Sequence, residues 1–189
     1  MRPATGEQHR LASAFRRTLI REATPDDTPA LVDTLIEAAN WVKQLDGTTM
    51  WLEGELEEHR VRSEVEAGLF VVAEVDDHVV GAMRFQLEDR LFWPDLDAHD
   101  SAFVHRLAVR RAYAGRGISK ALLQWAVERA RLLNRRYLRL DCDAERSRLR
   151  VLYERFGFRL HSFRQVGAYY VSRYELAVEG RRKGRPLRE

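Results

Sequence analysis

Apolar and polar residues change their period in the middle of the chain. Between Ser101 and Val109, apolar residues alternate with polar or small ones, as they do along a β-strand. From Ile118 onward they recur every three or four residues, which is typical of an amphipathic helix. We therefore predict a strand, a short basic loop over residues 110–116, and a helix that begins near Gly117.

The same two periods predict the remaining elements. Before this junction we expect a strand, two helices and an antiparallel strand pair, at residues 18–23, 25–45, 53–67, 68–75 and 79–85. After it we expect a strand, a helix and two closing strands, at residues 136–142, 147–156, 158–166 and 169–178. A strand, a crossover helix and a strand form a parallel pair. The predicted fold is α+β, with a mixed, mostly antiparallel sheet of about seven strands, a parallel pair in its middle and about four flanking helices.

Composition indicates a single domain. The chain has 189 residues, of which 45% are hydrophobic and 32% charged, enough for one complete core. We assign the domain to residues 18–178, between a flexible extension at 1–17 and a basic solvated tail at 179–189, because neither terminal segment has a sustained apolar period. The net charge of +3 is small, and the basic residues cluster at the loop and the termini. This favours an anionic ligand over a nucleic-acid partner.

Cysteine content and targeting signals predict a cytoplasmic protein. Cys142 is the single cysteine, so no internal disulfide can form. No apolar run is long enough to span a bilayer, and we expect no membrane partner. The N-terminal segment lacks the apolar centre of a secretory signal. Its scarcity of serine and its Glu7 make an organelle transit peptide the weaker alternative.

The loop before the central helix is suited to an anion. Gly115 and Gly117 lack a Cβ, so the backbone can turn tightly and a ligand can approach it closely. The first helical turn adds unpaired N–H groups and the positive end of the helix dipole, which favour a phosphate or pyrophosphate. A simple turn is the alternative, because the residues match neither a P-loop nor a Gly-x-Gly-x-x-Gly motif.

Three short segments follow one another in a distinctive order. They are Leu107-Ala108-Val109, Ala114-Gly115-Arg116-Gly117-Ile118-Ser119 and Tyr153-Glu154-Arg155-Phe156-Gly157-Phe158. In order and approximate spacing they resemble the motifs of the GNAT (Gcn5-related N-acetyltransferase) superfamily, and the resemblance extends over residues 18–178. Ala114 stands where the family has Arg or Gln, Ser119 where it has Gly or Ala, and Arg146 where many members have Asn.

The resemblance implies that acetyl-coenzyme A is the co-substrate. Its pantetheine arm would pair with the main chain of the Leu107-Ala108-Val109 strand, and its pyrophosphate would lie on the N–H groups between Gly115 and Lys120. Arg146 would meet a phosphate of the coenzyme. The implied cofactor-binding residues are Leu107, Ala108, Val109, Ala114, Gly115, Arg116, Gly117, Ile118, Ser119, Lys120 and Arg146.

Two residues are candidates for proton transfer. Tyr153 matches the tyrosine that protonates the coenzyme A thiolate in many relatives, and a phenol can donate this proton. His105, which alternation places on the face of Leu107 and Val109, is the candidate base, because a neutral imidazole can accept the proton of the amine, through water. Arylalkylamine acetyltransferases of the superfamily also carry a histidine there. The alternative for both residues is a satisfied position in the core.

The resemblance places the acceptor beside the helices that follow the first strand. Trp41 and Trp51 would form an aromatic wall there, unless they serve ordinary core packing. Asp141 could orient the amine or a relay water. Three acids of the loop at 91–100 could attract a cationic substrate or simply be solvated: Asp95, Asp97 and Asp100.

These residues predict an N-acetyltransferase that transfers the acetyl group to an amine by direct attack in a ternary complex. The alternative is an acyl-coenzyme A sensor of the same fold that binds without transfer. The acceptor is a small-molecule amine or a protein amino group. The sequence does not decide whether the protein forms a homodimer. We expect no metal, because no His, Cys or carboxylate pair has convincing ligand spacing, and no nucleophilic role for Cys142, which lacks a basic partner in the sequence.

Overall fold

The computed structural model describes residues 18–47, 51 and 53–178. The extension predicted at 1–17 and the tail predicted at 179–189 lie outside the described residues. Within the described part, no helix has the length and apolar character needed to cross a membrane. The elements in chain order are β1 (Leu19–Glu22), η1 (Pro25–Asp27), α2 (Thr28–Asp46), η2 (Glu53–Glu55), α3 (Glu58–Glu66), β2 (Phe70–Val75), β3 (His78–Gln86), η3 (Ala98–Asp100), β4 (Ser101–Val109), η4 (Arg111–Tyr113), α4 (Ile118–Leu132), β5 (Tyr137–Asp143), α5 (Ser147–Phe156), β6 (Arg159–Val166) and β7 (Tyr169–Ala177).

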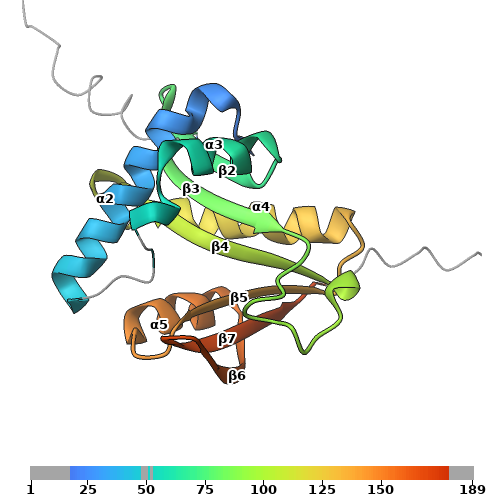
Figure 1. Ribbon diagram of the computed structural model, residues 1–189. Helices are drawn as coiled ribbons and strands as arrows, with labels where there is room; N and C mark the ends of the chain where they lie inside the picture. Colours follow the sequence, from blue (N-terminus) through green and yellow to red (C-terminus); the bar gives the residue numbers. More distant parts are fainter. Residues whose placement is uncertain (1–17, 48–50, 52, 179–189) are drawn as a thin grey trace, which may run out of the picture.

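The strands form one sheet in the order β1-β2-β3-β4-β5-β7-β6 (Figure 1). β4 and β5, which α4 connects, run parallel, and every other neighbouring pair is antiparallel. The predicted α+β fold, with a parallel pair in the middle of a mixed sheet, is therefore confirmed.

Helices cover both faces of this sheet (Figure 1). On one face α2 and α3 pack against β2 and β3 through a core that includes Leu31, Leu35, Val61, Phe70 and Val72. On the other face α4 and α5 pack through Leu122, Ala126, Tyr153, Val104 and Leu140. Each large apolar side chain buried in this way contributes about 1.5–3 kcal/mol, so the two layers hold the sheet between them.

Gly81 allows α4 to approach the sheet. A Cβ at this position would lie 2.8 Å from Ile118 Cγ2 and 3.2 Å from the Ala108 carbonyl oxygen. Any larger residue would push away the first turn of α4, because these distances are shorter than van der Waals contact. The start of α4 is thus fixed against β3 and β4.

The helix predicted at 53–67 is interrupted. The structure has a short 3-10 turn at Glu53–Glu55 and then α3 at Glu58–Glu66. The break falls at Glu57, whose extended backbone (φ −61°, ψ 136°) precedes the first turn of α3. The buried residues of α3 are Val61 and Val65, which pack against the sheet. This agrees with the thin apolar stripe in its sequence.

A β-bulge interrupts the alternation of β4. Ala82 pairs with Ala108 but Arg84 pairs with His105, so β4 has one more residue than β3 over this interval. The bulge includes Arg106, a non-glycine residue with φ 50°.

The bulge changes which side chains share a face. Beyond it, Leu107 and Val109 pack with Val104 in the α4 core, whereas Ala108 joins the α2 core. His105 lies on the α2 side, opposite Arg84. The expectation that His105 shares the face of Leu107 and Val109 is therefore wrong, because one extra residue reverses the period of two.

β4 and β5 separate halfway along their length. Residues 101–104 pair with residues 137–140, and the register ends there. From His105 onward the edge of β4 that faces β5 lacks a strand partner among the described residues. The parallel pair thus opens into a gap near the centre of the sheet.

Candidate active site

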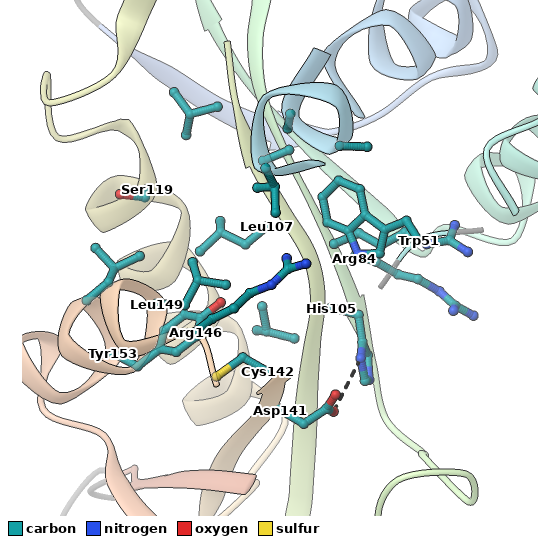
Figure 2. Close-up of a pocket in the computed structure, with 18 of the residues that line it drawn as sticks. Trp51, Arg84, His105, Leu107, Ser119, Asp141, Cys142, Arg146, Leu149 and Tyr153 are labelled. Carbon is teal, nitrogen blue, oxygen red and sulfur yellow. Dashed lines mark ion pairs between the residues drawn. The ribbon is translucent and has the colours of Figure 1, made fainter. Parts of the chain in front are cut away.

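A cavity of about 1090 Å³ occupies the gap between β4 and β5 (Figure 2). Its lining includes Leu107 and Ile118 from the α4 side and Arg84 and His105 from the α2 side, so it passes through the sheet. The divergence of the two parallel strands therefore joins two compartments into one site.

The loop between β4 and α4 forms one end of the cavity. Gly115 (φ 75°) and Gly117 (φ 82°) adopt left-handed backbone conformations, which strain any residue with a Cβ. A Cβ at Gly117 would meet no atom within 4 Å, so nothing in the described protein fills the space beside it. α4 begins at Ile118, and the N–H groups of its first turn have no helical acceptor. This end is a ready site for a phosphate.

The structure brings nearly all predicted cofactor-binding residues to this cavity. Ten of them line it: Leu107, Ala108, Val109, Ala114, Gly115, Gly117, Ile118, Ser119, Lys120 and Arg146. Arg116 is not in the lining, and its guanidinium instead lies 5.1 Å from the ring centre of Tyr113.

Arg146 lies deeper in the cavity than a surface phosphate would require. It precedes α5, its side chain is only 10% exposed, and its Nε lies 3.7 Å from Asp143 Oδ2. Figure 2 shows its guanidinium pointing across the gap toward Leu107, away from Ser119 at the glycine loop. Such a position suits contact with the middle of an extended ligand better than with its phosphates.

Tyr153 reaches the cavity from α5. Its side chain is 6% exposed and packs edge-on against Phe158, with ring centres 6.0 Å apart. Burial raises the pKa of Tyr153 well above its ordinary value, with a further contribution from the neighbouring Cys142. The hydroxyl therefore stays protonated at neutral pH, so it can supply a proton and cannot act as a base.

Cys142 lies beside Tyr153 in the cavity wall (Figure 2). It is buried in the α4 core, and burial raises the pKa of its thiol to about 12. A thiol with this pKa is not a nucleophile at neutral pH.

Two buried carboxylates flank His105. Its Nε2 lies 3.1 Å from Asp89 Oδ2, and its Nδ1 lies 3.7 Å from Asp141 Oδ1. Both carboxylates are only 4% exposed. Asp89 Oδ1 also accepts hydrogen bonds from the N–H groups of Leu91 and Phe92, at 3.1 and 3.0 Å, which fix the carboxylate in its loop.

The two carboxylates differ in acidity. Burial alone would raise the pKa of Asp89, but contact with His105 and the N–H groups of Phe92 and Leu91 holds it below its ordinary value. Burial raises the pKa of Asp141 to about 6, against the opposing effect of His105 and with the support of the Asp89 charge. Asp141 is therefore the carboxylate of this cluster that can exchange its proton just below neutral pH, whereas Asp89 stays ionised there.

The same three residues could in principle ligate a metal, since one ligand atom from each lies within 4.8 Å of the others. However, the carboxylates contact opposite ring nitrogens, so neither nitrogen faces both of them at contact distance. A metal ion needs its ligands to converge on one point. The arrangement is better suited to moving a proton.

Sequence reasoning missed Asp89 and considered three other acids of the same loop. Those three stabilise the fold instead: Asp95 pairs with Arg173 at 2.6 Å, Asp97 accepts from the His99 N–H at 2.8 Å, and Asp100 pairs with Arg139 at 3.1 Å. None of them is in the cavity lining, so the suggestion that they attract a substrate is not supported. Nothing in the local sequence distinguishes Asp89 from them.

Aromatic side chains form one wall of the cavity near α2. Trp41 of α2 and Trp51 both line it, as does Phe92, whose ring centre lies 6.2 Å from that of His105. Trp41 also packs beneath Arg111, with the guanidinium carbon 4.4 Å from the ring centre. Asp141 also lines the cavity.

These features agree with a family match. The model of the acetyltransferase (GNAT) family matches residues 30–158, and the chain belongs to this family. It is accordingly an acyltransferase that depends on acetyl-coenzyme A.

Individual relatives support the assignment. The Bacillus subtilis protein named uncharacterized N-acetyltransferase YesJ is 27% identical over 164 residues, which cover 83% of this chain and 89% of YesJ. A GNAT-family acetyltransferase from Listeria monocytogenes is 28% identical, with a TM-score of 0.67 and coverage of 84% of this chain and 95% of its own. The fold is shared by the PaiA N-acetyltransferase of Thermoplasma acidophilum, solved in complex with coenzyme A (17% identity, TM-score 0.68, coverage 85% and 99%).

Proposed function

We propose that this protein transfers the acetyl group of acetyl-coenzyme A to an amine by direct attack within a ternary complex. The observation that carries the proposal is the continuous cavity, which connects the glycine loop at one end with the Asp89–His105–Asp141 cluster at the other. A donor and an acceptor can therefore meet inside the sheet.

The cofactor would occupy the α4 side of the cavity. Its pyrophosphate would bind the N–H groups at the start of α4, and its pantetheine amides would pair with the unpaired edge of β4 beyond Val104. Arg146 would contact the arm where it crosses the gap. The coenzyme A bound to the Thermoplasma PaiA protein of the same fold supports this cofactor.

The transfer needs two proton movements. The neutral amine attacks the thioester carbon, forms the new C–N bond and yields a tetrahedral intermediate, whose oxyanion the free N–H groups of β4 would stabilise. The amine proton passes to His105, whose Nε2 lies 3.1 Å from Asp89 Oδ2. The C–S bond then breaks, and Tyr153 donates its proton to the leaving thiolate.

Direct transfer is favoured over an acetylated enzyme. Cys142 is the only thiol of the chain, and its raised pKa keeps it protonated. A non-catalytic sensor, the other candidate, would give no role to the proton-binding cluster around His105.

The test is a thiol-release assay with acetyl-coenzyme A and a panel of amines that includes amino acids, arylalkylamines, polyamines and a peptide with a free N-terminus. We expect free coenzyme A and acetylated amine in equal amounts, with intersecting initial-velocity lines. Binding of acetyl-coenzyme A without transfer to any amine would contradict the proposal. A mass increase of one acetyl group on Cys142 would replace direct attack with a two-step route.

A further inference from the structure

On the α2 side of the cavity, one arginine lies next to the candidate base. Arg84 of β3 is the cross-strand partner of His105 of β4, and both side chains line the cavity. Side chains directly opposite in an antiparallel pair share a face, with Cβ atoms about 5 Å apart. A guanidinium and a proton acceptor are therefore neighbours on the acceptor side.

The protein itself only weakly engages the Arg84 guanidinium. Its nearest charged contact is Glu64 at 3.5 Å, but the same carboxylate accepts a 2.6 Å hydrogen bond from Arg106. Arg84 Nε is buried and has no hydrogen-bond partner among the described residues. The side chain is one quarter exposed, toward the cavity that it lines.

The surroundings make this charge costly until a ligand binds. Burial lowers the pKa of Arg84 and the neighbouring Arg106 lowers it further, and the charges of Glu64, Asp89 and Glu55 offset these effects only in part. A carboxylate placed against the guanidinium would complete its hydrogen bonds in the two-pronged geometry that arginine favours.

We propose, on the basis of the acetyltransferase function above, that the acceptor is an α-amino acid with an apolar side chain, whose carboxylate binds Arg84 while its amine faces His105. In an α-amino acid the amine and the carboxylate share one carbon, so one small ligand can contact two side chains that are neighbours on one face of the sheet. Trp51 and Phe92 provide an apolar surface for the side chain.

A negatively charged lining would select a different class of substrate. Glu55 also lines the cavity and contributes to the field at Arg84. If the negative charge of Glu55 outweighed the positive charge of Arg84, the protein would prefer a diamine without a carboxylate. A carboxylate is favoured over a second amine because the partly exposed Arg84 guanidinium lines the cavity and has only a 3.5 Å contact with Glu64.

Matched substrate pairs test this assignment with the unaltered full-length protein. We compare kcat/KM for phenylalanine with 2-phenylethylamine, and for leucine with 3-methylbutylamine, which differ only by the carboxylate, and include putrescine as the diamine. We expect a preference of tenfold or more for each amino acid. Equal rates for both members of a pair, or a preference for the amines or for putrescine, would overturn the inference.

Variants identify the residue responsible. Arg84→Gln should lower kcat/KM for phenylalanine about 10- to 100-fold and leave that for 2-phenylethylamine unchanged. Arg90→Gln is the control, because Arg90 lines the same cavity but is 85% exposed and pairs with Glu88. It should retain the preference. An equal loss for both substrates in Arg84→Gln would assign Arg84 a structural role and reject the inference, as would an unchanged preference.

The outcomes also separate this inference from the proposed function. Acetylation of amines without any preference for the carboxylate would reject the amino-acid acceptor and keep the acetyltransferase. Failure to acetylate any amine of the panel would reject both.

Discussion

Asp141 is the carboxylate for which the structure makes the sharpest stability prediction. Its side chain is 4% exposed and lies near two other titratable groups, His105 and Asp89. Burial raises its pKa from 3.8 to about 6. Asp141→Asn removes the charge and keeps the shape, so the variant should be the more stable protein at neutral pH.

The magnitude follows from proton linkage. Each pKa unit corresponds to about 1.4 kcal/mol, so ionisation of Asp141 destabilises the folded protein by about 3 kcal/mol. The folded state holds this proton more tightly than the unfolded chain does. The contribution of Asp141 to stability is therefore greatest below pH 4, falls as the pH rises from about 4 to about 6, and is lost above pH 7.

Denaturant unfolding of wild type and variant between pH 4 and pH 8 measures this effect. The free energies of unfolding should be similar at pH 4 and diverge by up to about 3 kcal/mol at pH 8, in favour of Asp141→Asn. Asp143→Asn, on the same strand but with a side chain 26% exposed, is the control and should give no such divergence. A wild type that equals or exceeds Asp141→Asn at pH 8 would refute the reasoning.

Three further changes test the proposed chemistry. Gly117→Val should weaken coenzyme A binding, measured by calorimetry, because the valine side chain would enter the space that the coenzyme occupies. Gly68→Val is the control, since Gly68 also has a positive φ (71°) and open surroundings but lies outside the cavity. Tyr153→Phe should slow single-turnover acetyl transfer about a hundredfold with little effect on acetyl-coenzyme A affinity, and an unchanged rate would leave Tyr153 a packing residue. His105→Gln should lower kcat about a hundredfold at a fixed pH, whereas a lower melting temperature with an unchanged kcat would indicate packing alone.

Much of the fold could be predicted because local periods determine strands and helices. Alternation located β2, β3 and β5 within two residues of their ends, and the crossover helix between β4 and β5 required a parallel pair. The interruption before α3 was not visible, because its polar residues are compatible with either helix or turn.

The site could be predicted only where residues are close in sequence. The glycine loop and the start of α4 form one continuous segment, so their joint role could be inferred. Asp89 meets His105 only after the loop that follows β3 folds back over the sheet, a contact that no local pattern encodes. Arg84 has the same origin, since its neighbour His105 is defined by strand pairing and not by spacing.

The bulge at Arg106 has a consequence for how this chain can change. Deleting that one residue would restore strict alternation in β4 and leave Leu107 and Val109 on the α4 side and Ala108 on the α2 side, because the bulge holds the one extra residue. If the strand became regular with Arg106 retained, Leu107 and Val109 would instead move to the compartment now held by Ala108, and Ala108 to theirs. The length of β4 and its bulge are therefore linked, and a library that varies acceptor choice should keep both fixed.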